Sequence, residues 1–206
     1  MIGIRNEIFT TPNPNLALGT NRGVKNWAWG TSKLRPSTSV ASDDGVSVTL
    51  RALADYDNAI DIWSYLAYKN LDLAQIAGMA EGDALILSFM LRCNSRSALR
   101  SVMLIKGNGV SPLTDAADLG EVKDDERWHR YCVRLRRIAN AEFSGQWIYF
   151  YQGEPFREGD YYSFRDLKLE RGAWSPYVMG GGVTNYASLL YVIFCEGGQR
   201  HDRIAC

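Results

Sequence analysis

Short stretches in which apolar and polar residues alternate recur along the chain from residue 46 to residue 169. Turn-forming residues separate them, and no long amphipathic helix interrupts them. Alternate residues of a strand face opposite sides, so this alternation is typical of half-buried β-strands. The predicted strands span residues 46–52, 60–69, 84–93, 98–106, 127–138, 146–152 and 161–169. The pattern favours an all-β sandwich or barrel.

The segments between these strands have loop character. Residues 30–42 are rich in Ser and Thr and are predicted to be mostly loop. Residues 71–79 have a short helical or irregular pattern, and residues 111–126 form a polar stretch with room for one helical turn. The turn at residues 94–97 is predicted to make strands 84–93 and 98–106 partners.

Two of the strands carry aromatic rings on their predicted solvent face. In strand 60–69 the core face is predicted to hold Ile60, Ile62, Leu66 and Tyr68. Flat rings beside polar groups suit sugars, whose C–H faces stack on the rings and whose hydroxyls form hydrogen bonds. The candidate glycan-binding residues are Asp61, Trp63, Tyr65 and Lys69 in one strand and Trp147, Tyr149 and Tyr151 in another. The same rings would equally suit a subunit interface or the core.

Strand 127–138 has an arginine stripe. Tyr131, Val133 and Leu135 share its predicted core side, and the other side holds Arg130, Cys132, Arg134 and Arg136. The stripe is compatible with an acidic glycan, a neighbouring subunit or simple solvation.

The last strand, residues 161–169, follows the turn residues Gly159 and Asp160. Strict alternation predicts one face with Tyr161, Ser163, Arg165, Leu167 and Leu169, of which the two leucines reach the core. It predicts the opposite face with Tyr162, Phe164, Asp166, Lys168 and Glu170.

A family resemblance rests on two segments. The pattern G-D-x-Y-x-F-x-D-L-K-L-E-x-G over residues 159–172, followed by Pro176 and Tyr177, resembles the end of the carbohydrate-binding-module-like jelly rolls of bacteriophage tail and other virion proteins. Asn15-Leu16, Gly19-Thr20 and Trp27 resemble the opening of such domains. The resemblance implies a jelly-roll β-sandwich of two antiparallel sheets over residues 15–178.

The same resemblance implies a structural calcium ion between the start of the domain and its last strand. It places Asp166 beside that ion, with main-chain oxygens from residues 15–19. The alternative is that Asp166 is an ordinary strand residue. Apart from this calcium, no cofactor is expected.

The two ends of the chain differ from the middle. Residues 1–14 end in Thr-Pro-Asn-Pro and predict an extended N-terminal arm. Residues 179–206 begin with three glycines at 180–182 and hold the apolar run 188–195. Such a glycine-hinged extension is suited to docking on another subunit, although packing in its own chain is the alternative.

Composition narrows the choice of function. The chain has 206 residues, a formal net charge of zero, 46% hydrophobic and 22% charged residues, which is typical of a globular protein. Zero net charge argues against nucleic-acid binding. No signal peptide or membrane-spanning run is predicted. The four cysteines lack metal-ligand spacing and are expected to be reduced.

Catalytic chemistry finds little support in the sequence. The two histidines are His129 and His201, and no G-x-S-x-G nucleophile pattern accompanies them. We therefore expect a protein without enzymatic activity.

Three functions remain in the order that the sequence favours. The first is a structural virion protein, a phage tail, fibre or head-decoration component, assembled in the host cytoplasm. It would contact itself, other virion proteins and cell-surface polysaccharide, without entering a membrane. The second is a carbohydrate-binding accessory module of a polysaccharide-degrading system. The third is a small hydrolase or lyase on a jelly roll.

Overall fold

The computed structural model describes residues 14–31, 38–55, 64–95, 99, 101–106, 112–139, 144–151, 157–172 and 174–177. Within these ranges the chain is almost entirely strand. In chain order the elements are β1 (Trp27–Thr31), β2 (Thr38–Ala41), β3 (Val48–Ala52), β4 (Ser64–Tyr68), α1 (Leu73–Ile76), β5 (Ala84–Cys93), β6 (Ser101–Lys106), β7 (Ala117–Asp118), β8 (His129–Arg136), β9 (Gln146–Tyr151) and β10 (Tyr161–Arg171).

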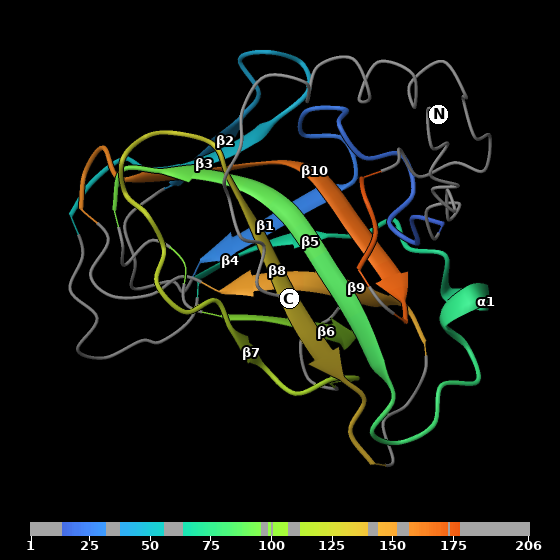
Figure 1. The fold of residues 1–206 in the computed structure, drawn as a ribbon. Helices are drawn as coiled ribbons and strands as arrows, with labels where there is room; N and C mark the ends of the chain where they lie inside the picture. The colour runs from blue at the N-terminus through green and yellow to red at the C-terminus, as the bar shows by residue number, and fades with distance from the viewer. Residues whose placement is uncertain are drawn as a thin grey trace, which may run out of the picture.

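Two five-stranded sheets form the layers of a sandwich (Figure 1). The first sheet has the strand order β1-β4-β9-β6-β7, and the second has the order β2-β3-β10-β5-β8. Every strand pairing within them is antiparallel. The predicted jelly-roll β-sandwich is therefore confirmed.

Aromatic rings fasten the two sheets together. Phe150 of the first sheet meets Phe164 of the second with ring centroids 4.4 Å apart. Phe89 lies edge-on to both rings, at 5.2 and 5.3 Å, and Trp27 stacks on Phe164 at 5.8 Å. Burying a side chain of this size contributes roughly 1.5–3 kcal/mol, so the four rings are a large part of the core.

The predicted faces of most strands are confirmed. Leu66 and Tyr68 of β4 and Phe150 of β9 are buried between the sheets. In β8, Val133 and Leu135 are buried, while Arg134 and Arg136 are exposed on the other side. Ile60 and Ile62 lie outside the described residues.

The last strand departs from strict alternation. Tyr162 and Phe164 lie in the core, and so do Leu167 and Leu169. An uninterrupted strand would place these two pairs on opposite faces. The prediction that the two leucines share a face with Tyr161 is therefore wrong.

A β-bulge at Asp166 causes the change. The pairing of β10 with β5 shifts between Arg165 and Lys168, and Asp166 has a φ of 51°. Asn21 holds this left-handed residue by two hydrogen bonds. Its Nδ2 donates to Asp166 Oδ1 at 2.6 Å, and the Asp166 main-chain N–H donates to Asn21 Oδ1 at 2.7 Å. A non-glycine residue in this conformation is strained, so the bulge depends on its partner.

The segment before β1 lies along β10 beyond the bulge. Asn15 Nδ2 donates to the carbonyl of Leu167 at 2.8 Å, and Asn15 Oδ1 accepts from the N–H of Leu169 at 3.1 Å. The N–H of Leu16 donates to the carbonyl of Leu169 at 2.7 Å. Asn15 Oδ1 also accepts from the N–H of Ala17, and Asn15 is only 5% exposed. The start of the domain thus holds the last strand in place; we call these bonds from Asn15 and Leu16 to Leu167 and Leu169 the clamp.

A buried ion pair anchors residues 174–177 on the outer face of the second sheet. Lys168 Nζ and Glu170 Oε2 are 3.0 Å apart, and neither side chain is exposed. The Ser175 hydroxyl donates to Glu170 at 2.6 Å, and Lys168 donates to the carbonyl of Pro176 at 2.8 Å. Burial lowers the pKa of Lys168, and the hydrogen bond to Glu170 opposes that shift. Removing one partner of such a pair leaves an uncompensated buried charge.

The prediction that the strands at residues 84–93 and 98–106 are partners is wrong. Strands β5 and β6 lie in different sheets, so they are not hairpin partners; β6 pairs with β9 and β7. Alternation shows that a strand has one buried face, but it does not show which strand lies beside it. Of the predicted loops, residues 30–42 contain the end of β1 and all of β2, whereas residues 112–126 are mostly irregular and contain the two-residue β7.

The predicted arm, residues 1–14, and the predicted extension, residues 179–206, lie outside the described residues except for Pro14. Among the residues that are described, no helix has the length and apolar character that a membrane crossing needs.

Asn15→Ala is expected to lower the free energy of unfolding by about 2–3 kcal/mol. The change leaves the buried carbonyl of Leu167 and the buried N–H of Leu169 without partners. Asn70→Ala is the control, since Asn70 is exposed and donates one bond, to the carbonyl of Leu18; its effect should stay below about 1 kcal/mol. Urea titration followed by tryptophan fluorescence measures both. Equal midpoints for Asn15→Ala and the wild type would contradict the clamp.

Candidate functional site

The described candidate glycan-binding residues gather on the outer face of the first sheet. Tyr65 and Lys69 come from β4 and the residue after it, and the other rings come from β9. Asp61 and Trp63 lie outside the described residues. We call the following set the aromatic face: Tyr65, Ala67, Lys69, Met103, Ile105, Trp147, Tyr149 and Tyr151.

Strand register explains why these side chains meet. Tyr149 lies opposite Ala67 of β4 on one side and Met103 of β6 on the other. In the same way Tyr151 lies opposite Tyr65, and Ile105 lies opposite Trp147. Directly opposed residues of one face are close enough to pack. The small Ala67 leaves room for the large ring of Tyr149.

The three rings of β9 form a parallel row. The centroids of Trp147 and Tyr149 are 6.0 Å apart with 13° between the planes, and those of Tyr149 and Tyr151 are 5.9 Å apart with 19°. A sugar ring held between two of them would need two contacts of about 3.5–4.0 Å each. The spacing is too small for that. A ligand can therefore lie across the row but not between its rings.

Accessibility differs along the row. Tyr149 is only 2% exposed, and the centroids of the Tyr65 and Tyr149 rings are 4.8 Å apart. Tyr65, Trp147 and Tyr151 are partly exposed. Tyr149 thus acts as a support, and the other three rings are those that a ligand can reach.

Charge and protonation also vary over this face. The ammonium of Lys69 lies 5.9 Å from the Trp147 ring, a cation–π distance. Burial raises the pKa of Tyr65, Tyr149 and Tyr151 above the ordinary tyrosine value. Their hydroxyls are neutral at physiological pH and can both donate and accept hydrogen bonds.

Sequence analysis missed three members and one neighbour of the aromatic face. Met103, Ile105 and Ala67 follow the alternation of their own strands, but only the sheet order places them beside the β9 rings. Gly30 of β1 lies opposite Tyr65, and a Cβ atom there would be 2.7 Å from the Tyr65 ring. Glycine is therefore required at this position for the ring to lie against β1.

The residues around Asp166 do not fit calcium. Among the described residues no group of three or more His, Cys, Asp and Glu side chains could hold a metal ion, and calcium takes six to eight oxygens. The Asp166 carboxylate accepts from Asn21, and its carbonyl accepts from Arg130 Nη1 at 3.0 Å. The guanidinium of Arg130 thus already supplies a positive charge beside Asp166.

Some of the main-chain oxygens that the resemblance assigned to the ion also have protein donors. The carbonyl of Leu18 accepts from the Tyr68 hydroxyl at 2.6 Å and from Asn70 at 2.8 Å. The carbonyl of Leu16 accepts from the N–H of Asp72 at 2.8 Å. Two of the predicted main-chain ligands, the carbonyls of Leu16 and Leu18, thus accept hydrogen bonds from protein groups.

His129 is the first residue of β8 and bonds to the turn before it. Its Nε2 lies 2.8 Å from Asp125 Oδ1, which also accepts from the N–H of Arg127 at 3.0 Å. The hydrogen bond from His129 is the main cause that lowers the pKa of Asp125. This pair closes the turn before β8.

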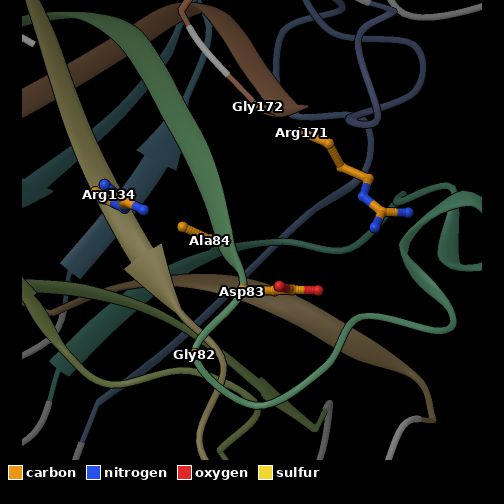
Figure 2. Close-up of a pocket in the computed structure, with 6 residues that line it drawn as sticks. All are labelled: Gly82, Asp83, Ala84, Arg134, Arg171 and Gly172. Atoms are coloured by element: carbon orange, nitrogen blue, oxygen red, sulfur yellow. The ribbon is translucent and has the colours of Figure 1, made fainter.

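The arginine stripe of β8 divides into two parts. The guanidinium of Arg130 is largely covered, and burial lowers its pKa. Arg134 is exposed and lines an open hollow of about 310 Å³ at the end of the second sheet (Figure 2). Figure 2 shows the Arg171 side chain turned away from Arg134 and toward α1, where its Nη1 donates to the carbonyl of Gln75 at 3.4 Å. The hollow brings together none of the predicted glycan-binding residues.

Comparison with known proteins identifies the fold but does not identify a family. No protein-family description and no curated protein matches the sequence. A CBM4 structure is 15% identical, with 82% of this chain and 100% of that chain covered, at a TM-score of 0.49.

Two larger proteins share the fold at a TM-score of 0.50 and 12% identity. One is an arabinose-bound α-L-arabinofuranosidase, MgGH51, with 78% of this chain and 27% of that chain covered. The other is the enzymatically active domain of tailspike protein 4 of bacteriophage CBA120, with 77% and 21% covered. This chain thus spans only a part of either protein, and identity this low shows the fold alone.

Calcium and EDTA are expected to leave the thermal unfolding midpoint unchanged, since the cation position is taken by Arg130. Arg130→Gln should instead lower stability by about 1–2 kcal/mol, because the partly buried carbonyl of Asp166 loses its charged donor. Arg134→Gln, on the exposed part of the same strand, is the control and should change stability by less than about 0.5 kcal/mol. A midpoint that rises with calcium and falls again with EDTA would refute this interpretation.

Proposed function

We propose that the protein is a non-enzymatic structural component of a virion that binds cell-surface polysaccharide through its aromatic face. The observation that carries the proposal is the meeting of Tyr65, Trp147 and Tyr151, from two strands, on one outer face of the sandwich. Aromatic rings with a few polar groups around them are typical of ligand sites.

The polysaccharide would lie across the row of rings. Its apolar C–H surfaces would contact the exposed parts of Trp147 and Tyr151, and its hydroxyls would bond to the tyrosine hydroxyls and to Lys69. Met103 and Ile105 would widen the apolar surface on one side. The buried Tyr149 would keep the outer rings in place.

Binding without bond cleavage is part of the proposal. The aromatic face, as defined above, consists of rings, aliphatic side chains and one ammonium group. Most glycoside hydrolases cleave with a pair of carboxylic acid side chains, and this set holds no carboxylate.

The location in a virion is supported by the resemblance of residues 15–27 and 159–177 and by the fold shared with part of a phage tailspike protein. In this proposal the chain assembles in the host cytoplasm with copies of itself and with other virion proteins. Residues 1–14 and 179–206 would make those contacts.

A second candidate is an accessory module of a polysaccharide-degrading system. The fold shared with part of an arabinose-bound α-L-arabinofuranosidase favours it. It keeps the aromatic face as the binding surface and differs only in what the chain is attached to.

Trp147→Ala is expected to weaken polysaccharide binding about tenfold, the loss of roughly 1.4 kcal/mol of ring contact. Binding is found with a glycan array and measured by titration calorimetry. Gly30→Ala should weaken it as well, because the new methyl group displaces the Tyr65 ring.

The matched control is Trp29→Ala. Trp29 is 49% exposed on β1 and is not part of the aromatic face, so its loss should leave affinity unchanged. If Trp29→Ala weakens binding as much as Trp147→Ala, or if binding survives Trp147→Ala, the site is wrong.

Removal of residues 179–206 is expected to convert an oligomer into monomers while the unfolding midpoint stays the same. Light scattering of the full chain and of residues 1–178 measures the difference. A full chain that is monomeric at high concentration, or an oligomer that survives the deletion, would refute assembly through the extension.

A further inference from the structure

The outer face of the second sheet carries alternating cations and rings. The guanidinium of Arg51 lies 4.8 Å from the Tyr161 ring centroid, and that of Arg92 lies 5.9 Å from it. The guanidinium groups of Arg92 and Arg165 lie 4.9 and 4.4 Å from the centroid of Trp128. We call these five residues the arginine ladder. Each contact is within cation–π range.

Strand register builds the ladder across three strands. Arg51 of β3 lies opposite Tyr161 of β10, and Arg92 of β5 lies opposite Ser163 of β10. Trp128 immediately precedes β8, whose first residue pairs with the neighbour of Arg92. Arg165 is the last outward residue of β10 before the bulge. Four of the five ladder residues therefore lie in strands, and Trp128 directly precedes one.

Two of its arginines have donors to spare. Arg51 Nη1 donates to the carbonyl of Gly159 at 3.0 Å. Arg92 and Arg165 donate no hydrogen bond to any of the described residues, and the Nε of each is buried without an acceptor. A guanidinium has five N–H donors, and a buried donor without an acceptor costs free energy.

The carboxylates around the ladder are engaged elsewhere. Asp166 bonds to Asn21 and lies 3.9 Å from Arg165 Nε, too far for a hydrogen bond. Asp125 bonds to His129, and Asp160 accepts from the N–H of Arg157. Neither Arg92 nor Arg165 therefore donates a hydrogen bond to a described carboxylate, although Arg165 lies within ion-pair distance of Asp166.

One acceptor is placed beside these cations. Glu126 has a φ of 61°, a strained conformation for a non-glycine residue. Its Oε2 accepts from the Tyr161 hydroxyl at 3.1 Å, and the residue is exposed. A carboxylate next to guanidinium groups that have unused N–H donors suits a ligand with both an anionic group and hydroxyl donors.

We propose that the arginine ladder is a second binding surface, specific for carboxylated saccharides such as uronate chains. The carboxylate is held by Arg92 and Arg165 beside Trp128, and sugar hydroxyls donate to Glu126. A uronate matches both kinds of group, whereas an acidic peptide side chain matches only the guanidinium groups. This surface lies on the opposite sheet from the aromatic face, so the two are tested independently.

Titration calorimetry with oligogalacturonate, oligomannuronate and oligoguluronate tests the proposal against a neutral gluco-oligosaccharide and poly-glutamate. At least one uronate should bind, and more weakly as salt rises. Arg92→Gln and Arg165→Gln should each weaken binding at least about tenfold, as expected for a hydrogen bond to a charged group. Arg92→Lys should weaken it less than Arg92→Gln, because the charge stays but the planar fork is lost.

Arg134→Gln is the matched control, because it removes the same charge from an exposed position of the same sheet outside the ladder. It should leave uronate affinity unchanged, and Trp147→Ala on the aromatic face should do so too. Thermal unfolding of each variant shows whether it is folded; Arg92→Lys carries the test if a glutamine variant is not.

Three results would overturn the proposal: no uronate binds, Arg134→Gln weakens binding equally, or poly-glutamate binds as tightly with the same sensitivity to Arg92. The last result would identify an acidic protein segment as the partner. Loss of neutral polysaccharide binding on Trp147→Ala concerns the aromatic face alone.

Discussion

The rest of the structure depends on the reciprocal pair of hydrogen bonds between Asn21 and Asp166. It holds the β-bulge of β10, where the chain gains one residue and turns over. Before the bulge Phe164 reaches the core, and after it Leu167 does. Without the bulge one of these two sides would face solvent, and the central strand of the second sheet could not contribute along its whole length.

The bulge also determines what lies outside. It leaves Arg165 outward beside Trp128, and it turns Lys168 and Glu170 outward beneath residues 174–177. The sandwich therefore has two different outer faces. The first sheet presents packed rings and aliphatic groups, and the second presents guanidinium groups between rings. A chain of zero net charge can in this way carry one mainly apolar surface and one surface rich in guanidinium groups.

Protein groups supply the hydrogen bonds at the place where the opening motif meets β10. Arg130 donates to Asp166, and Tyr68 and Asn70 donate to Leu18. Every one of these bonds joins a residue near the start or middle of the chain to one of the motif segments. Burial of Arg130 is costly for a charged group, and its hydrogen bond to a carbonyl offsets part of that cost. The resemblance correctly placed Asp166 near the start of the domain, but hydrogen bonds from Asn21 and Arg130 are found there.

The sequence by itself determined the all-β class, the faces of β4, β8 and β9, and the gathering of Trp147, Tyr149 and Tyr151 on one side, because side-chain direction in a regular strand has a period of two. Tertiary structure alone decided the partners of each strand, the meeting of Tyr65 with Tyr151, and the arginine ladder, because alternation carries no information about which strands are neighbours. It also decided the faces of β10, since one left-handed residue held by Asn21, 145 positions away in the chain, reverses the alternation.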